Sequence, residues 1–212
     1  MDVGDWRSAI LSLSRAIKLR SSYGEAYHLR GIAYTMQGKY NQALPDFDQA
    51  IELRPNDPEP YISRGCAHDH KGSGPRALQD FDRAIELAPD EARAFNSRGI
   101  THLNLGDYRL ALRDFEESIR LDPNDHWYYF SRAMVFYHIE QYEKAIDDLD
   151  IVVERASDDA EAVFQRGLAY LGLGDNERAE ADFARAVELG LNASSVAKLA
   201  RAKRDQLQQP QP

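Results

Sequence analysis

The chain has 212 residues, and 43% of them are hydrophobic, which is enough for a continuous packed core. Its formal net charge of −9 argues against a general affinity for nucleic acid or for an anionic membrane. The single cysteine, Cys66, excludes an internal disulfide and a cysteine-rich metal site. No apolar run is long enough to cross a bilayer and no secretory signal is visible, so a cytoplasmic location is expected.

A short phrase of sequence returns at a fixed interval along the chain. It occupies residues 43–53, then 77–87, then 111–121, which is a period of 34 residues. A fixed period of this length indicates an array of small similar units rather than one globular core. Such arrays bury a core between neighbouring units and present a long surface to a partner.

Each unit follows the same order of residue types. An Arg and a small residue come first, followed by a ring, a Gly, an Ala, a large apolar residue and, in three units, Leu-x-Pro. Apolar residues recur at three- and four-residue steps, which places them on one face of a helix. Gly38 and its equivalents stand where the first helix must stop, and the closing Pro ends the second. Each unit is therefore predicted to be a helix–turn–helix hairpin.

The period, the column order and the spacing of Gly, Ala, Phe and Pro resemble the tetratricopeptide repeat family. The resemblance spans roughly residues 1–193, and it implies an all-α fold, a right-handed α-solenoid of antiparallel helix–turn–helix repeats. In chain order, the expected parts of one domain at 1–207 are a half repeat at 1–23, full repeats at 24–57, 58–91, 92–125, 126–159 and 160–193, and a capping helix at 194–207, before a disordered tail at 208–212.

Two parts of the array depart from the regular pattern. Repeat 126–159 has Ala133 for Gly, Glu140 for the turn Gly and Leu149 for Phe, so we expect it to pack least regularly. The capping helix carries an apolar stripe and a basic side. The stripe comprises Val196, Leu199 and Ala200, and the basic side comprises Lys198, Arg201, Lys203 and Arg204.

One pair of charged columns recurs in every full unit. The Arg column is Arg30, Arg64, Arg98, Arg132 and Arg166, and the Asp column is Asp46, Asp80, Asp114, Asp148 and Asp182. An Arg beside the close-packed Gly column is partly buried and needs a carboxylate. We therefore expect each Arg to pair with an Asp of its own or the next unit and to hold the stack in register. The alternative is an Arg ladder that binds an acidic ligand.

The resemblance also implies a concave groove lined by the first helix of each unit. By helical spacing the candidate groove residues are His28, Ile32, Ile62, Cys66, Asp69, Arg93, Asn96, Ile100, Trp127, Phe130, Met134, Tyr137, Phe164, Leu168 and Leu171. The floor becomes aromatic toward the C-terminal end, which suits a hydrophobic or amphipathic peptide.

Intramolecular packing is the alternative to a peptide groove. Ile32, Ile100, Met134 and Leu168 stand next to the packed small-residue column, and the helix at 194–207 could fold over Phe164 and Leu171. Full burial of Phe130 and Phe164 would contradict the groove. A groove position would make Cys66 accessible.

Two partner modes known in the family are not supported by the residues. Binding of chaperone C-terminal tails requires a two-carboxylate clamp of Lys, Asn and Arg on the first helices. The corresponding columns hold His28, Ile32, Ser63, Arg93 and Ser97, or, one repeat along, Ile62, Cys66, Ser97, Trp127 and Ser131. The asparagine ladder of the sugar-transferase relatives is replaced by Leu29, Ser63, Ser97, Ser131 and Gln165. The chaperone carboxylate clamp is absent from the sequence, so binding of chaperone C-terminal tails is not predicted.

No constellation of residues predicts catalysis, a cofactor or a metal. His68 and His102 occupy the aromatic core column, and His68 and His70 are two residues apart on a helix, where side chains diverge. The predicted function is a non-catalytic scaffold that binds a partner peptide or helix. The alternative is a self-assembling or regulatory segment of a larger protein, because the half repeat would leave an open face around Trp6, Ile10 and Leu13. That open face makes a homo-oligomer a second expectation.

Overall fold

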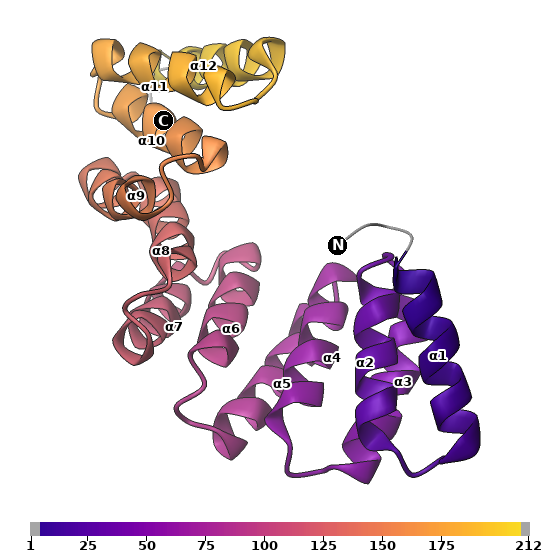
Figure 1. The fold of residues 1–212 in the computed structure, drawn as a ribbon. Helices are drawn as coiled ribbons and strands as arrows, with labels where there is room; N and C mark the ends of the chain where they lie inside the picture. The colour runs from indigo at the N-terminus through magenta and orange to yellow at the C-terminus, as the bar shows by residue number, and fades with distance from the viewer. Residues whose placement is uncertain (1–4, 209–212) are drawn as a thin grey trace. The chain divides into compact units, whose positions relative to one another are not determined.

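The computed structural model describes residues 5–208, in which every regular element is an α-helix. Within residues 5–107, and likewise within residues 108–208, successive helices pack on one another and are joined by short turns (Figure 1). The all-α fold of repeated helical hairpins predicted from the sequence is therefore confirmed. The predicted disordered tail lies, apart from Gln208, outside the described residues.

The helices alternate between the first and second members of the predicted hairpins. They are α1 (Asp5–Leu19), α2 (Gly24–Thr35), α3 (Tyr40–Leu53), α4 (Pro58–His70), α5 (Gly74–Leu87), α6 (Ala92–Asn104), α7 (Tyr108–Leu121), α8 (His126–His138), α9 (Tyr142–Arg155), α10 (Ala160–Gly172), α11 (Asn176–Glu188) and α12 (Ala193–Leu207).

The chain divides into two compact units, 1–107 and 108–212. The N-terminal unit contains α1 to α6, and the C-terminal unit contains α7 to α12. Within each unit the second helix of one hairpin packs against the first helix of the next, as in α3 against α4 and α9 against α10. Repeat 92–125 contributes one helix to each unit, so the single domain expected at 1–207 stays a prediction.

Local sequence explains where the helices begin and turn back. Asp57 and Asp125 cap α4 and α8 by accepting hydrogen bonds from the backbone N–H of the residue two positions on, at 3.1 and 2.9 Å. Between the helices of a hairpin, Gly38 and Gly174 adopt φ values of 70° and 80°. Residues with a side chain rarely adopt this left-handed conformation, so glycine ends the first helix at low cost.

The core of three hairpins contains a ring packed on a glycine. Phe47, Phe81 and Phe183 from the second helices are buried. Each lies directly over the Gly of the preceding helix, and a Cβ built at Gly31 would stand 2.5 Å from the Phe47 ring. The missing side chain is therefore what lets the two helices approach closely.

The irregular repeat 126–159 packs through two substitutions of opposite size. Ala133 adds a methyl where the other repeats have Gly, and Leu149 is smaller than the usual Phe. Both are completely buried and belong to one core cluster with Val152 and Ala162. The expected loss of regular packing is not seen at this contact, because the added volume and the removed volume lie at the same place. The remaining departure is Glu140, which adopts a φ of 60° at the turn.

Candidate partner-binding surfaces

The Arg and Asp columns meet inside the hairpins. The guanidinium of Arg64 donates from Nε and Nη2 to the two carboxylate oxygens of Asp80, at 3.0 and 2.6 Å. Arg30 and Asp46 make the same bidentate pair, and their hydrogen bonds raise the pKa of the Arg30 guanidinium. The paired geometry recurs at Arg132 with Asp148 and at Arg166 with Asp182. These Arg side chains are committed to internal carboxylates, which removes the basis for an acidic-ligand ladder.

A second contact joins each of several Arg side chains to the preceding repeat. Arg64 donates from Nη1 to Asp48 of α3, and Arg166 donates from Nη1 to Asp150 of α9, both at 2.7 Å. Arg98 makes the equivalent contact with Asp82 at 2.7 Å. The guanidinium therefore bridges its own hairpin and the one before it. This second carboxylate column was not expected from the sequence, although its 34-residue spacing was visible there.

In the N-terminal unit, the first helices are linked by polar contacts among the predicted groove residues. His28 Nε2 of α2 lies 2.9 Å from Ser63 Oγ of α4, and Arg93 of α6 forms an ion pair with Glu59 of α4. Asp69 accepts a hydrogen bond from Asn104 Nδ2 at 3.1 Å. These polar side chains contact one another, whereas the buried Asn96 Oδ1 has no hydrogen-bond partner among residues 5–208.

Several groove predictions in this unit are corrected by burial. His28 is 5% exposed and Ile62 is 3% exposed, so neither is available to a partner. Burial lowers the pKa of His28. Ile32 is half-buried against Phe47, and Asn96 is half-buried on α6. Ile100 and Arg93 are the exposed members of the predicted set in this unit. The reason is geometric, because His28 and Ile62 stand three residues before the packed Gly31 and Gly65 and therefore lie on the same face of the helix.

Cys66 is also less accessible than a groove position implies. Its Sγ lies 3.9 Å from Ser97 Oγ of the neighbouring helix, and the side chain packs against the core cluster of Phe81. Burial raises the pKa of the Cys66 thiol, which disfavours the reactive thiolate.

In the C-terminal unit, α8 carries a row of large side chains along one face. Trp127 is 53% exposed, and its ring meets that of Phe130 edge-on with 5.2 Å between centroids. Met134 and Tyr137 continue the row at helical spacing, and these two and Phe130 are half-buried. We name Trp127, Phe130, Met134 and Tyr137 the α8 row. It contains all four of the residues predicted on this helix.

The predicted groove residues of α10 lie in the protein core instead. Phe164, Leu168 and Leu171 are 4%, 9% and 2% exposed, so the expectation that they form an open floor was wrong. Helix α12 packs on α10, and its Val196 and Ala200 join the same core cluster. On α10, the predicted groove residues therefore pack inside the protein beneath α12, as the intramolecular alternative expected. On α8, Phe130 is half-buried and not fully buried.

Helix α12 is anchored by a buried lysine, although the sequence predicts this residue on its basic side. Lys203 is 8% exposed, and its Nζ donates a hydrogen bond to the Tyr142 hydroxyl at 3.0 Å. The same nitrogen lies 4.9 Å from the ring centroid of Tyr137. Burial raises the pKa of the Tyr137 hydroxyl, and the nearby lysine opposes this effect. Two aromatic rings thus surround one ammonium group.

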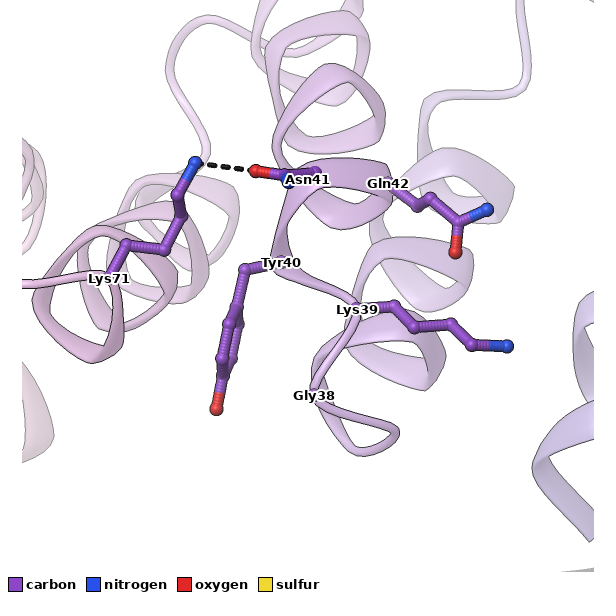
Figure 2. A pocket seen from close by; sticks show the side chains of 6 residues that line it. All are labelled: Gly38, Lys39, Tyr40, Asn41, Gln42 and Lys71. Atoms are coloured by element: carbon purple, nitrogen blue, oxygen red, sulfur yellow. Dashed lines mark hydrogen bonds between the residues drawn. The ribbon is translucent and has the colours of Figure 1, made fainter.

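A shallow pocket lies outside all of these surfaces, at the turn between α2 and α3. It has a volume of about 350 Å³ and is lined by Lys39, Tyr40 and Lys71, among others. Figure 2 shows Lys71 reaching across to Asn41, to which it donates a hydrogen bond at 2.6 Å. Its walls are mostly exposed side chains. Within residues 5–208 no three His, Cys, Asp or Glu side chains come together as a metal-binding group.

Family models match most of the repeats. Two models described as tetratricopeptide repeat match the chain, one at residues 24–57 and 92–125 and the other at residues 130–195. The chain belongs to the tetratricopeptide repeat family. Among curated proteins a search finds no match.

Solved structures with the same fold include three that cover most of the chain. A tetratricopeptide repeat protein from Parabacteroides merdae is 25% identical, with a TM-score of 0.74 over 94% of this chain and 78% of its own. YrrB, a repeat protein with an unusual peptide-binding site, is 19% identical, with a TM-score of 0.66 over 89% and 97% of the two chains. One chain of the APC/C hetero-tetramer Cut9-Hcn1 is 19% identical, with a TM-score of 0.83 over 93% of this chain.

The match to Cut9-Hcn1 covers only 40% of that longer chain. The likenesses to YrrB and to Cut9-Hcn1 establish the fold and nothing more, because the identities are low. Among the helices of residues 5–208, none has the length and apolar character of a membrane span. As a repeat protein of this family, the chain is a protein-interaction scaffold in the general sense.

Proposed function

We propose that the chain is a non-catalytic, cytoplasmic scaffold that binds a hydrophobic or amphipathic segment of a partner protein through the α8 row. The observation that carries the proposal is the exposure of Trp127 next to Phe130 on a helix whose backbone is fixed by the hairpin. Exposed aromatic side chains on a rigid element are the residues that dominate the binding energy of protein interfaces.

The α8 row favours an apolar partner for two reasons. Its four side chains offer aromatic and thioether surface with no charged group among them. The edge-on contact between Trp127 and Phe130 fixes the two rings relative to one another before a partner arrives. A preorganised surface loses little conformational entropy on binding, so a short segment of partner is sufficient.

Polar surfaces elsewhere support a passive scaffold rather than an enzyme. The first helices of the N-terminal unit use their polar side chains to contact one another, as His28 and Ser63 do. We propose no catalytic residue, cofactor or metal for this chain, and no binding of nucleic acid, membrane or chaperone tails.

The proposal is tested with a displayed library of random peptides of about 15 residues. Selected peptides are measured by calorimetry against the wild type, against Trp127→Ala/Phe130→Ala, and against the control Leu11→Ala/Leu19→Ala. The control removes two exposed apolar side chains from α1 (55% and 89% exposed). We expect the α8 variant to weaken binding by about 30-fold or more, as for loss of hot-spot residues, and the control to leave binding unchanged. Equal affinity of the α8 variant and the wild type would overturn the proposal.

Self-assembly is the second candidate function. The residues expected on the open face, Trp6, Ile10 and Leu13, are half-buried, and the exposed apolar side chains of α1 that favour this candidate are instead Leu11 and Leu19. Large apolar side chains exposed on one terminal helix are typical of surfaces that accept another helix. Sedimentation equilibrium across a range of concentrations tests this candidate. A mass that rises with concentration in the wild type and not in Leu11→Ser/Leu19→Ser would support assembly through α1. A constant monomer mass would exclude it.

A further inference from the structure

Three second helices begin with a tyrosine, and the ring of the third, in repeat 126–159, is covered differently from the other two. In the N-terminal unit Tyr40 stacks on His70 of the next hairpin, with 5.4 Å between ring centroids. In the C-terminal unit Tyr108 stacks on His138 in the same way, at 6.0 Å. Tyr142 is the next ring of this column. The residue 30 positions after it is Gly172, whereas the residue 30 positions after Tyr40 or Tyr108 is a histidine.

Gly172 makes room around the Tyr142 ring. A Cβ built at Gly172 would stand 2.7 Å from three carbons of that ring, so a side chain could not be added without moving the ring. At this position the backbone of Gly172, rather than an imidazole, lies against the Tyr142 ring. Tyr137 lies beside it edge-on, at 5.7 Å between centroids.

Lys203 of α12 occupies the space beside these two rings. Its Nζ lies 5.0 Å from the Tyr142 centroid and 4.9 Å from the Tyr137 centroid, and it donates a hydrogen bond to the Tyr142 hydroxyl. No ion pair to Lys203 is seen among residues 5–208. A buried ammonium is normally paired with a carboxylate, so here the ring faces and the hydroxyl oxygen supply the compensation.

The buried face of α12 has a simple pattern. Val196, Ala200 and Lys203 are its buried residues, at positions i, i+4 and i+7 of the helix. The first two enter the core cluster with Phe164 and Leu171, and the third reaches the rings. The protein therefore already packs one amphipathic helix, α12, against α10 and the two tyrosines, with Lys203 following the apolar residues of its buried face.

We infer that Tyr137 and Tyr142 form a subsite for a basic side chain carried on an amphipathic partner helix, and that Lys203 is its resident intramolecular occupant. The inference rests on the proposed function, because Tyr137 is also the last residue of the α8 row. It names the partner class as a helix with small apolar residues followed, one turn on, by Lys or Arg. A partner of this pattern displaces α12 and extends from the α8 row onto α10.

The first experiment asks whether the subsite requires a cation. Hydrogen exchange of the α12 amides is followed by mass spectrometry in the full chain, in Lys203→Met and in Lys203→Arg. Methionine keeps an unbranched apolar stem but removes the charge, whereas arginine keeps a charge that stacks on rings. We expect exchange at least about tenfold faster in Lys203→Met, and exchange within about threefold of the wild type in Lys203→Arg. Unchanged exchange in Lys203→Met would overturn the inference.

The second experiment asks whether a helix in trans uses the same subsite. The probe is a fluorescent peptide of residues 192–208, with a matched peptide carrying the Lys203→Met change. Both are titrated into the full-length Lys203→Met chain, whose resident helix is loosened. We expect the natural peptide to bind at least about tenfold tighter, and this advantage to vanish in a chain that also carries Tyr142→Leu. Equal binding of the two peptides, or no binding of either, would overturn the inference.

A control separates this inference from the proposed function. The Trp127→Ala/Phe130→Ala variant keeps Tyr137, Tyr142 and Lys203, so exchange at α12 is expected to match the wild type. If library peptides prove indifferent to the α8 row while Lys203→Met still opens α12, the proposed function fails and the cation subsite stands. If the α8 row binds peptides and Lys203→Met leaves α12 protected, the subsite fails and the scaffold stands.

Discussion

Phe81 lies over Gly65 so closely that a Cβ built on the glycine would stand 2.7 Å from the ring carbon Cε1. Phe81 is 1% exposed, so its ring is enclosed by neighbouring protein atoms. The contact joins the two helices of one hairpin, and the same contact recurs between Gly31 and Phe47. The column of small residues in the sequence is therefore explained by a column of rings.

We predict that Gly65→Ala destabilises the protein by about 1–3 kcal/mol, because the added methyl overpacks a filled core. The irregular repeat suggests the compensation, since it pairs Ala133 with Leu149 in place of Gly and Phe. Phe81→Leu in the Gly65→Ala background should recover part of the loss. Urea denaturation of the two single variants and the double variant gives the coupling energy. Strictly additive losses would contradict this account of the contact.

The paired carboxylates of Arg64 should differ in their contribution to stability. Asp80 holds the guanidinium bidentately with a side chain that is 7% exposed, whereas the side chain of Asp48 is 62% exposed. Asp80→Ala leaves a largely buried charge without its main partner, and we expect a loss of about 2–3 kcal/mol. Asp48→Ala should cost less than about 0.5 kcal/mol, as exposed ion pairs do. Comparable urea midpoints for the two variants would argue against a structural role for the ladder.

Glu140 is the one described residue other than glycine with a positive φ. It stands where the other hairpins have glycine, so its side chain imposes a conformational cost. Glu140→Gly is expected to stabilise the protein by about 0.5–1 kcal/mol after the larger chain entropy of glycine is counted. Gly38→Ala, at a φ of 70°, is the reverse test and should destabilise by about 1 kcal/mol. Thermal melting of both variants measures the effect, and a lower melting temperature for Glu140→Gly would refute it.

Stability should decrease as the pH falls through the titration of His28. Burial lowers the folded pKa of His28 below its ordinary value of 6.5, although Glu25, Glu59 and Asp57 oppose this effect and Arg54 reinforces it. Below pH 6.5 the unfolded chain therefore binds the proton more readily, and the free energy of unfolding falls until the folded pKa is reached. His28→Gln should show a shallower decrease between about pH 7 and 5. Parallel pH profiles from urea titrations would contradict the prediction. Burial also lowers the pKa of His68. His68 is present in both proteins, so it contributes the same pH dependence to each.

Cys66 should react slowly in the folded protein. Its thiol is packed against the core and its pKa is raised by burial, so the thiolate fraction at pH 8 is small. We expect alkylation by iodoacetamide to be at least about tenfold slower in native buffer than in 6 M urea after correction for the denaturant. Equal rates would show that the thiol is open to solvent.

The hairpins were predictable because their determinants are local and periodic. The caps at Asp57 and Asp125 and the turn at Gly38 each depend on a few adjacent residues. The Arg and Asp columns were predictable for the same reason, since a buried Arg requires a carboxylate. The second partner of Arg64, Asp48, required knowledge of how neighbouring hairpins face one another.

The candidate site was predicted less well because exposure depends on the last helix. Sequence periodicity assigned Leu199 to the apolar stripe of α12 and Lys203 to its basic side. The structure leaves Leu199 51% exposed and buries Lys203. The face that α12 buries depends on what it packs against, namely the core cluster of α10 and the Tyr142 hydroxyl, and no pattern within residues 194–207 contains that information. Phe164 and Leu171 lie in the same core cluster as Val196 and Ala200 of α12.

The bridging position of Arg64 has a consequence for how such a chain can lengthen or shorten over evolutionary time. Its two carboxylates lie 16 residues away on either side in the sequence, at Asp48 and Asp80. Gain or loss of a whole 34-residue unit restores an Arg between two carboxylates at the new junction. Gain or loss of any other length leaves a guanidinium facing the wrong residue. Duplication in complete units is therefore the change in length that this charge pattern tolerates.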